Sequence, residues 1–455
     1  MSIIYSAGHI SILQLTEKQI ERIHTKSVKH KWLTMDDVMR RFPHLSEKIY
    51  GSLNNESLSK CNETSRCWRI HLRKQKFFQI RIIEATVGQF HEVGETWNKV
   101  FKTASSVTII ALRIAVQKIY QKNNGLYYYE GLTPLHVAAA AGHLLLLTTL
   151  ENGLTGKYPT DSEGCTPFHY AAQNGHLEVC DYIIDRIEDK NPKSNDGSTP
   201  LHDAASNGHM KICELIMMYL DNTNPSDENG VTPLHNASCS GYLDVCKLIM
   251  ATLQNKNPED KEGHTPFLLA ANAGYLEICK FIMKFLRDKN PRTHFGLTTL
   301  HAAALGGQLE VCKLIMGEIS DKNPRSDAGF TPLHAAADYG HLELCKLIMQ
   351  HLKDKNPRRI DGYTPLHAAA EKGHLKLCEH FMENLTDKNP EQVNGLTPLH
   401  LAAQNGNREI CELILDSIQN KMPKDQNGKT PVMLALENQH FELSLRLINS
   451  HLQKK

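Results

Sequence analysis

The sequence predicts an all-α solenoid with short hairpin loops, preceded by a small helical N-terminal domain. One observation is a Thr-Pro pair that recurs every 33 residues, from Thr133-Pro134 to Thr430-Pro431, with no insertion or deletion. Thr298-Thr299 fills the single gap in the series, so the chain contains ten copies of the unit. A period of this length indicates stacked supersecondary units, none of which buries its apolar face alone. We therefore expect the repeats to form one curved stack.

Glycine and proline set the limits of the helices within one unit. Gly362 lies in a turn, and Thr364 caps the first helix. Pro365 occupies the first helical position, where its missing N–H costs nothing. We expect this helix to end at Gly373 and a second helix to run from there towards Leu385.

The pattern Thr-Pro-Leu-His-x-Ala, seen at residues 364–369 and repeated at this period, resembles the ankyrin repeat. The resemblance covers residues 126–455, where it implies ten repeats that bind protein partners. We expect residues 428–455 to be a capping repeat that faces water, because His, Gly and Cys of the unit are replaced there. The chain departs from the family where each unit closes with Leu-x-Asp-Lys-Asn-Pro, as at residues 352–357. This motif predicts a second helix about one turn longer, followed by a left-handed Asn.

Eight histidines share one position of the unit, and eight cysteines share another. The resemblance implies that each histidine is structural and joins neighbouring turns by hydrogen bonds. Packed helices lie too far apart for a disulfide between repeats, so we expect buried, unreactive thiols and no metal site. The histidines are His136, His169, His202, His235, His301, His334, His367 and His400. The cysteines are Cys180, Cys213, Cys246, Cys279, Cys312, Cys345, Cys378 and Cys411.

The N-terminal residues differ in charge from the repeats. Residues 1–125 carry a net charge of +10 and the remainder carries −9. No apolar run reaches the roughly 18–20 residues that a membrane span needs, and we see no secretion signal. Twelve cysteines without such a signal are typical of a reducing compartment. We expect a monomeric protein of the cytoplasm or nucleus.

Residues 1–33 are expected to form an N-terminal segment, residues 34–81 a helical module and residues 82–125 a helical connector that caps the stack. The apolar spacing of the helical module resembles the F-box, at Pro43, Ile49, Leu53, Leu58, Cys61 and Trp68. The resemblance implies that Pro43, Ile49, Leu53 and Leu58 bind the adaptor subunit of a cullin–RING ubiquitin ligase. The alternative is a helical module that only caps the stack.

Function in a repeat protein is expected where the repeats differ, at the loop tips and at the ends of the first helices. In the middle repeats these positions carry aromatic, aliphatic and guanidinium groups, which are typical of binding hot spots. Arginines one repeat apart favour an acidic partner segment. The alternatives are that the rings pack on neighbouring hairpins, and that the site lies in the polar N-terminal third, with Asp203 and Asn236. The predicted substrate-binding residues are Arg292, Phe295, Leu297, Leu305, Arg325, Phe330, Tyr339, Arg358, Arg359 and Tyr363.

The sequence contains no phosphate-binding loop, nucleophile elbow or zinc-protease motif, so we predict no enzymatic activity and no cofactor. Basic and aromatic residues between Arg66 and Arg81 suggest nucleic-acid binding, but a solvated helix face is the interpretation we favour. We predict a protein-interaction module that recognises substrates for a cullin–RING ubiquitin ligase, with the stack holding the substrate. The alternative is a plain ankyrin-repeat scaffold or signalling adaptor.

Overall fold

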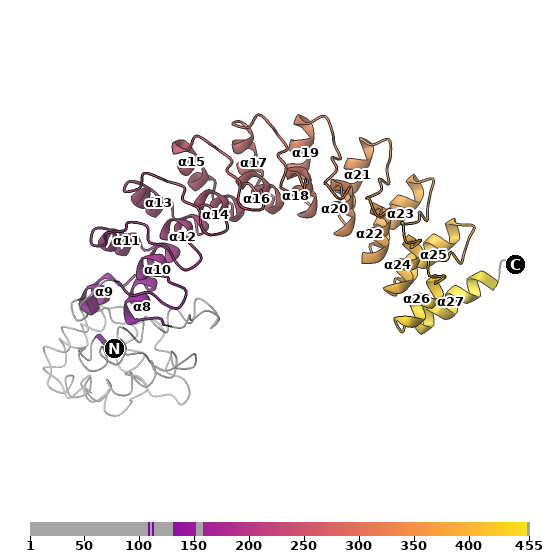
Figure 1. Cartoon of the computed structure of the whole chain (residues 1–455), viewed down its shortest axis with the longest axis horizontal. Coiled ribbons are helices and arrows are strands. Elements are labelled where there is room, and N and C mark those ends of the chain that lie inside the picture. Colours follow the sequence, from indigo (N-terminus) through magenta and orange to yellow (C-terminus); the bar gives the residue numbers. More distant parts are fainter. Residues whose placement is uncertain (1–107, 110–111, 113–130, 152–157, 453–455) are drawn as a thin grey trace, which may run out of the picture. The chain divides into compact units, whose positions relative to one another are not determined.

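The protein is described here by a computed structural model, which covers residues 108–109, 112, 131–151 and 158–452 of the 455-residue chain. The chain divides into two compact units, Met1–Asn195 and Asp196–Lys455. Within the described ranges there are twenty helices and no strand, and the helices form ten consecutive pairs. The predicted all-α repeat fold is therefore confirmed (Figure 1).

The helices keep the labels of Figure 1. The first unit contains α8 (Pro134–Ala140), α9 (Leu144–Glu151), α10 (Pro167–Asn174) and α11 (Leu177–Ile184). The second unit begins with α12 (Pro200–Ser206), α13 (Met210–Met217), α14 (Pro233–Ser240), α15 (Leu243–Thr252), α16 (Pro266–Ala273), α17 (Leu276–Met283), α18 (Thr299–Leu305) and α19 (Leu309–Glu318). It continues with α20 (Pro332–Asp338), α21 (Leu342–Gln350), α22 (Pro365–Lys372), α23 (Leu375–Asn384), α24 (Pro398–Gln404), α25 (Arg408–Ser417), α26 (Pro431–Glu437) and α27 (Phe441–Leu452).

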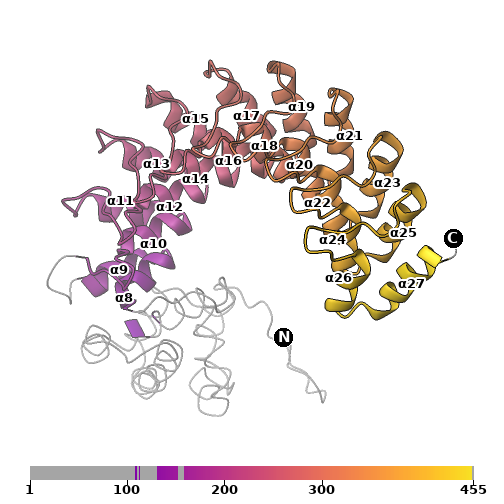
Figure 2. The same cartoon turned by 45° about the vertical axis from the view of Figure 1, so that its right-hand side comes forward.

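In the second unit the helix pairs follow one another in a curved row. The first helix of each pair lies on the inner side of the curve and the second on the outer side (Figures 1 and 2). Each first helix packs against the first helix of the next pair. Alanines such as Ala369 are completely buried in this layer, and their small side chains allow the helices to approach closely.

The ends of the first helix follow the prediction. In α22, Pro365 is the first helical residue, and the Thr364 hydroxyl accepts a hydrogen bond from the His367 N–H at 3.4 Å. Gly373 ends the helix with φ +81°. Gly362 also has φ +81°, and a Cβ atom there would lie 2.9 Å from the Cα of Gln392 in the next loop. Both the backbone conformation and this close approach require glycine.

The second helix runs towards the leucine of the closing motif, as expected, and ends before it. Helices α15 and α23 end directly before Leu253 and Leu385. Helix α17 ends at Met283, and Leu286 then donates its N–H to the Met283 carbonyl at 3.3 Å. The Lys289 ammonium donates to the carbonyls of Met283 and Leu286 at 2.6 and 2.8 Å. The lysine therefore satisfies carbonyls at the helix end, and the chain leaves in a tightened turn.

The asparagine of the closing motif is not left-handed, which corrects the second expectation. Among the described residues other than glycine, only Gln439 has a positive φ. The Asn356 N–H donates to Asp354 Oδ1 at 3.0 Å, and Asn356 Oδ1 accepts the Leu366 N–H at 3.2 Å. The first N–H groups of a helix have no partner inside the helix. The asparagine satisfies one of them, so it joins the end of one repeat to the first turn of the next helix.

The cysteines at the repeated position confirm the core prediction. All eight are free and completely buried. Burial raises the pKa of the Cys213 and Cys279 thiols to about 12, so both stay protonated at neutral pH. Since the thiolate is the nucleophile and the metal ligand, these groups act as small apolar core side chains.

Candidate partner-binding surface

The hairpin loops of the second unit are held in place by the repeated histidines. His367 Nδ1 accepts the Thr364 N–H at 3.2 Å, and His367 Nε2 donates to the Leu396 carbonyl in the following hairpin at 3.2 Å. His301 and His334 make the same bond to the loop residue 29 positions later, at 3.0 and 3.1 Å. The predicted structural role of these histidines is therefore confirmed.

Hydrogen bonding defines the protonation state of these histidines. A carbonyl oxygen only accepts, so Nε2 carries the proton, while Nδ1 is free of a proton and accepts the amide N–H. Burial lowers the pKa of His301 and His367 to about 4 and that of His334 to about 3. Both ring nitrogens are occupied and the rings are neutral at pH 7, so they serve as anchors for the loops.

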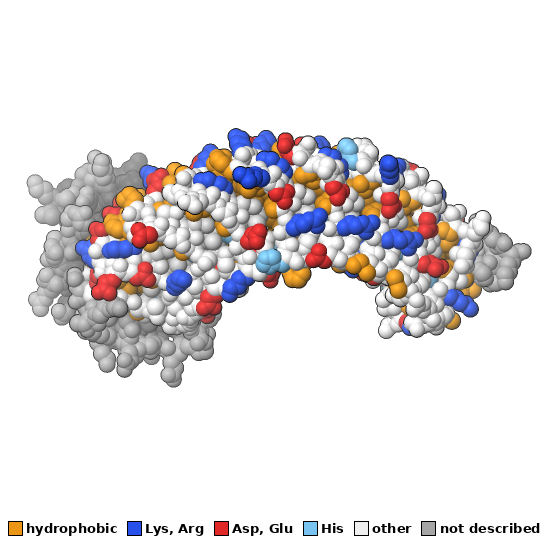
Figure 3. All heavy atoms as spheres, turned by 45° about the horizontal axis from the view of Figure 1, so that its top comes forward, with side chains coloured by type: hydrophobic (Ala, Val, Ile, Leu, Met, Phe, Trp, Pro, Cys, Tyr) orange, Lys and Arg blue, Asp and Glu red, His pale blue; other side chains and the backbone are white. Residues whose placement is uncertain are grey.

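Three predicted arginines form a ladder along the hairpins. Arg292 Nη1 donates to the Arg325 carbonyl at 2.9 Å, and Arg325 Nη1 donates to the Arg358 carbonyl at 2.6 Å. Arg358 Nη1 continues to the Glu391 carbonyl at 2.6 Å. All three side chains are exposed, and each guanidinium has five N–H donors, so the ladder leaves donors for a partner. Figure 3 shows that basic side chains recur along the second unit.

Two of the predicted aromatic residues face water. Phe295 is 65% exposed at a hairpin tip. Tyr339 follows α20 and is 60% exposed, with its ring stacked on His341 at a centroid distance of 6.2 Å. A largely exposed ring gains apolar burial only when a partner covers it. These two side chains therefore have the geometry expected of binding residues.

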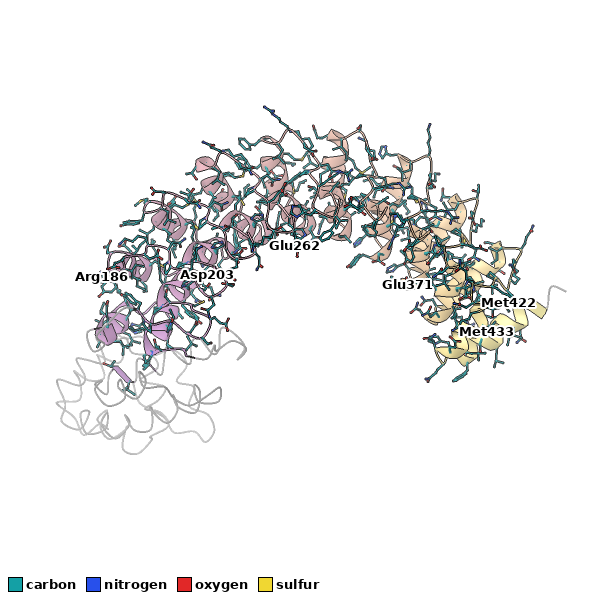
Figure 4. All side chains as sticks on the ribbon, viewed as in Figure 1. Arg186, Asp203, Glu262, Glu371, Met422 and Met433 are labelled. Atoms are coloured by element: carbon teal, nitrogen blue, oxygen red, sulfur yellow. The ribbon has the colours of Figure 1, made fainter. Side chains whose placement is uncertain are left out.

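Two other predicted aromatic residues pack on the framework. The Phe330 ring lies between His301 and His334, at centroid distances of 6.0 and 5.7 Å. Tyr363 stacks on His367 at 5.4 Å, and its hydroxyl donates to Glu371 at 2.7 Å. Glu371 lies at the end of α22 on the inner side of the curve (Figure 4). The packing alternative therefore holds for these half-buried rings.

The remaining predicted residues, Leu297, Leu305 and Arg359, are half-buried and support the loops. The Leu297 carbonyl accepts the Thr293 N–H across the hairpin at 2.7 Å. The Leu305 carbonyl accepts His341 Nε2 at 3.2 Å. Arg359 forms an ion pair with Asp361 at 3.1 Å, and its guanidinium lies 5.2 Å from the Tyr363 ring centroid.

Sequence reasoning missed two exposed side chains at the same hairpin tips. Ile360 is 75% exposed and Val393 is 67% exposed. Each lies two residues before a turn glycine, where the corresponding residues of the other described hairpins are polar. The sequence did contain a signal for these residues, namely an aliphatic side chain at a turn position that is polar in the other hairpins.

The alternative site in the polar N-terminal third differs from residues 292–363 in its side chains. Asp203 in α12 and Asn236 in α14 are half-buried and come from the first turns of helices on the inner side of the second unit (Figure 4 labels Asp203). Burial, followed by the charge of Asp196, raises the pKa of Asp203 to about 8. A carboxyl that is largely protonated at pH 7 gives little attraction for a basic partner. Tyr219 and Tyr242 in this region are 44% and 38% exposed, less than Phe295 and Tyr339.

Several predictions lie outside the described residues. They are the modules at residues 1–33 and 34–81, with the F-box-like positions Pro43, Ile49, Leu53 and Leu58. Of the connector at residues 82–125, only Thr108, Ile109 and Leu112 are described, and all three are buried. In the described part of the chain, no three His, Cys, Asp or Glu residues are grouped to hold a metal ion. No helix there combines the length and apolar character required to cross a membrane.

Comparison with known proteins gives one finding. A family profile described as ankyrin repeats (three copies) matches residues 108–196, 186–260, 249–326, 300–392 and 366–455. No curated protein matches the sequence. The matched segments span more than half of the chain and coincide with the repeated helix pairs. The chain therefore belongs to the ankyrin-repeat family, whose stacked helix pairs are protein–protein interaction modules.

Proposed function

We propose that the hairpin loops and first-helix ends of residues 292–363, together with Val393, form the surface that holds the protein partner. We call this set the tip surface; its exposed members are Arg292, Phe295, Arg325, Tyr339, Arg358, Ile360 and Val393. The observation that carries the proposal is the combination of exposed apolar tips with an arginine ladder. Large apolar groups beside guanidinium groups are the composition of interface hot spots.

The chemistry of the tip surface suits an acidic partner segment that also carries apolar side chains. Complete burial of one Phe or Ile side chain is worth about 1.5–3 kcal/mol. The arginines contribute less to affinity than to orientation and association rate, because exposed charges are screened. A partner would therefore be anchored by the rings and aliphatic tips and selected by the ladder.

The test is capture by the full-length chain with the two exposed rings removed together, Phe295→Ala and Tyr339→Ala. Because both rings face water, the melting temperature should stay within a few degrees of wild type. Isotope-labelled lysate and mass spectrometry then compare the captured proteins. Met218→Ala is the matched control, since Met218 is exposed in the second unit but lies outside the tip surface. Unchanged capture by the double variant would refute the proposal.

The finer proposal is that this chain recruits substrates to a cullin–RING ubiquitin ligase through residues 34–81. Its support is the F-box-like spacing of Pro43, Ile49, Leu53 and Leu58. The alternative is a scaffold or signalling adaptor with a head that caps the stack. Leu53→Asp should abolish capture of the ligase adaptor while capture through the tip surface continues. If wild type recovers no ligase subunit, the scaffold function stands and the tip-surface proposal is unaffected.

A further inference from the structure

We propose that the tip surface binds an extended partner segment with an acidic side chain at every third residue, one for each arginine of the ladder. This inference rests on the proposed function and adds the backbone conformation and the charge spacing of the partner. The arginines concerned are Arg292, Arg325 and Arg358, which occupy one position in three consecutive repeats. All three are exposed, so the spacing of the repeats sets the spacing of three accessible positive charges.

The guanidinium groups of the first two arginines keep donors for a ligand. Every hydrogen bond that the structure shows for Arg292 and Arg325 starts from Nη1, which donates to backbone carbonyls. Their Nε and Nη2 groups have no partner among the described residues. Arg358 differs, because its Nη2 lies 3.4 Å from a carboxylate oxygen of Asp387. A guanidinium that backbone carbonyls hold in place presents its remaining N–H groups in the planar geometry that suits a carboxylate.

The distance between repeats fits one kind of partner backbone. Helices α18, α20 and α22 pack on one another in order, and packed helices lie about 8–10 Å apart. A polyproline II segment has three residues per turn and rises about 9.3 Å over them, so every third side chain lies on one face at this spacing. Side chains on one face of a β-strand repeat at about 6.6 Å, and every seventh residue of an α-helix returns at about 10.5 Å. Of these three periods, only that of polyproline II lies within the range.

Two exposed aromatic rings of the tip surface favour the same backbone. Phe295 follows Arg292 by three residues, and Tyr339 follows α20 in the repeat of Arg325. Proline-rich segments in the polyproline II conformation bind surfaces with aromatic rings, and they lose little conformational entropy because they are already extended. We therefore expect prolines between the acidic residues of the partner.

Glutamates at both ends limit the ladder to three arginines. Glu259 and Glu391 are exposed and occupy the ladder position in the repeats before and after it. A fourth acidic side chain at the same spacing would meet one of these carboxylates, and like charges oppose binding. The partner is thus expected to carry three acidic positions in this register, with neutral or basic residues beyond them.

The experiment measures the fluorescence anisotropy of labelled synthetic peptides with the full-length chain at low salt. Three peptides contain six prolines and three glutamates each, with the glutamates three residues apart, two residues apart or adjacent. The peptide with the three-residue spacing should bind about tenfold more tightly than the other two. An alanine-rich helical peptide with glutamate at every seventh residue tests the alternative backbone.

One variant links the preference among peptides to the ladder. Arg292→Gln together with Arg325→Gln should make the three proline peptides bind equally, because the charges that match their spacing are gone. The control replaces Lys280, Lys313 and Lys346 by glutamine. These lysines have the same repeat spacing but are paired with glutamates at 2.7–2.8 Å, so this variant should keep the preference.

A second variant should strengthen binding. Asp387→Asn removes the charge beside Arg358, while the Oδ1 atom that accepts the Asn389 N–H at 3.2 Å is kept. Arg358 then has no competing carboxylate, so the peptide with the three-residue spacing should bind about two- to fivefold more tightly.

Four outcomes overturn the inference: proline peptides that bind equally or not at all, tightest binding of the helical peptide, a preference that survives the double arginine variant, or no gain from Asp387→Asn. Capture from lysate with Phe295→Ala and Tyr339→Ala tests the tip surface separately. If that variant loses capture while the peptides show no preference, the tip surface holds the partner and only the spacing is wrong. If capture is also unchanged, both proposals fail.

Discussion

The hairpins at residues 227–264 and at residues 292–363 have the same backbone and opposite charge. Asp260 donates its N–H to the His264 carbonyl at 2.9 Å, and Thr293 does the same to Leu297 at 2.7 Å. The first set carries Glu228, Glu259 and Glu262, whereas the second carries Arg292, Arg325, Arg358 and Arg359. Neighbouring repeats thus share a framework while the charge of their tips differs, and the proposed tip surface lies on the basic set.

The two sets also stabilise their loops by different means. Asp227 Oδ1 accepts the N–H groups of Asn229 and Val231, both at 2.8 Å. In the basic set, Ser326 Oγ accepts only the Phe330 N–H, at 3.1 Å. There the arginine ladder and the Phe330 ring link each hairpin to its neighbours instead. In the hairpin of Ser326, support has moved from a carboxylate inside the loop to the ladder and a packed ring, whereas Asp361 Oδ1 still accepts the Tyr363 N–H at 3.0 Å in the next hairpin.

The largest effect on stability should come from low pH, because it protonates the buried histidines of the framework that both sets share. The pKa of His301 and His367 is lowered to about 4 and that of His334 to about 3, from about 6.5 in the unfolded chain. Their stabilisation is complete above pH 6.5 and is lost as the pH falls towards 4 and then 3. The combined loss should be of the order of several kcal/mol. Urea unfolding at a series of pH values measures it.

The matched variant for this prediction is His334→Leu, because Leu268 occupies the same position in an earlier repeat. The variant should be less stable at pH 7, and its stability should depend less steeply on pH. If the free energy of unfolding of the variant depends on pH as steeply as that of wild type, other groups cause the acid sensitivity.

Removing the ladder should affect binding more than folding. Arg292→Gln, Arg325→Gln and Arg358→Gln together should weaken partner capture by about 10–100-fold at low salt, with a smaller difference at high salt. Three lysines on the second helices, Lys280, Lys313 and Lys346, have the same spacing and pair with glutamates at 2.7–2.8 Å. The corresponding lysine-to-glutamine variant is the control for net charge. If both variants lose binding equally, overall charge acts rather than the tip surface.

A third experiment compares the loops directly. Asp227→Ala removes a charged acceptor of two N–H groups and should cost about 1.5–3 kcal/mol. Ser326→Ala removes one longer hydrogen bond and should cost about 0.5–1 kcal/mol. Thermal unfolding of both variants in parallel checks the ranking. If the two variants lose the same free energy of unfolding, the ladder does not stabilise the basic hairpins.

The smallest effect is expected where the Thr-Pro series is interrupted. The Thr299 hydroxyl is buried and has no hydrogen-bond partner. Thr299→Val should therefore stabilise the protein by about 1 kcal/mol. The contrasting variant is Thr331→Val, whose hydroxyl lies 2.9 Å from His334 Nδ1 and caps α20, and it should lose about 1 kcal/mol. A loss of stability in Thr299→Val would indicate that its hydroxyl has a partner in solution.

The sequence alone determined the repeated framework. The Thr caps, the glycine turns and the buried thiols follow from residues a few positions apart, repeated at one period. The loop-binding role of the histidines was implied by the ankyrin resemblance, since each bond joins residues 29 positions apart. Capping and turn conformations depend on such short-range interactions, so a single sequence is sufficient to predict them. The conformation of the closing motif was harder to predict from the sequence. Its Asn356 side chain bonds to Leu366 in the next unit, and no pattern within one unit contains that contact.

Only the tertiary structure decided which predicted site residues face water. Phe295 and Phe330 look equivalent in the sequence, as large rings near a loop tip, yet Phe295 is exposed and Phe330 lies between two histidines. The outcome depends on side chains contributed by the neighbouring repeat, about 30 residues away. Whether a side chain is exposed depends on the groups that pack against it, and the stacking of the repeats determines those groups.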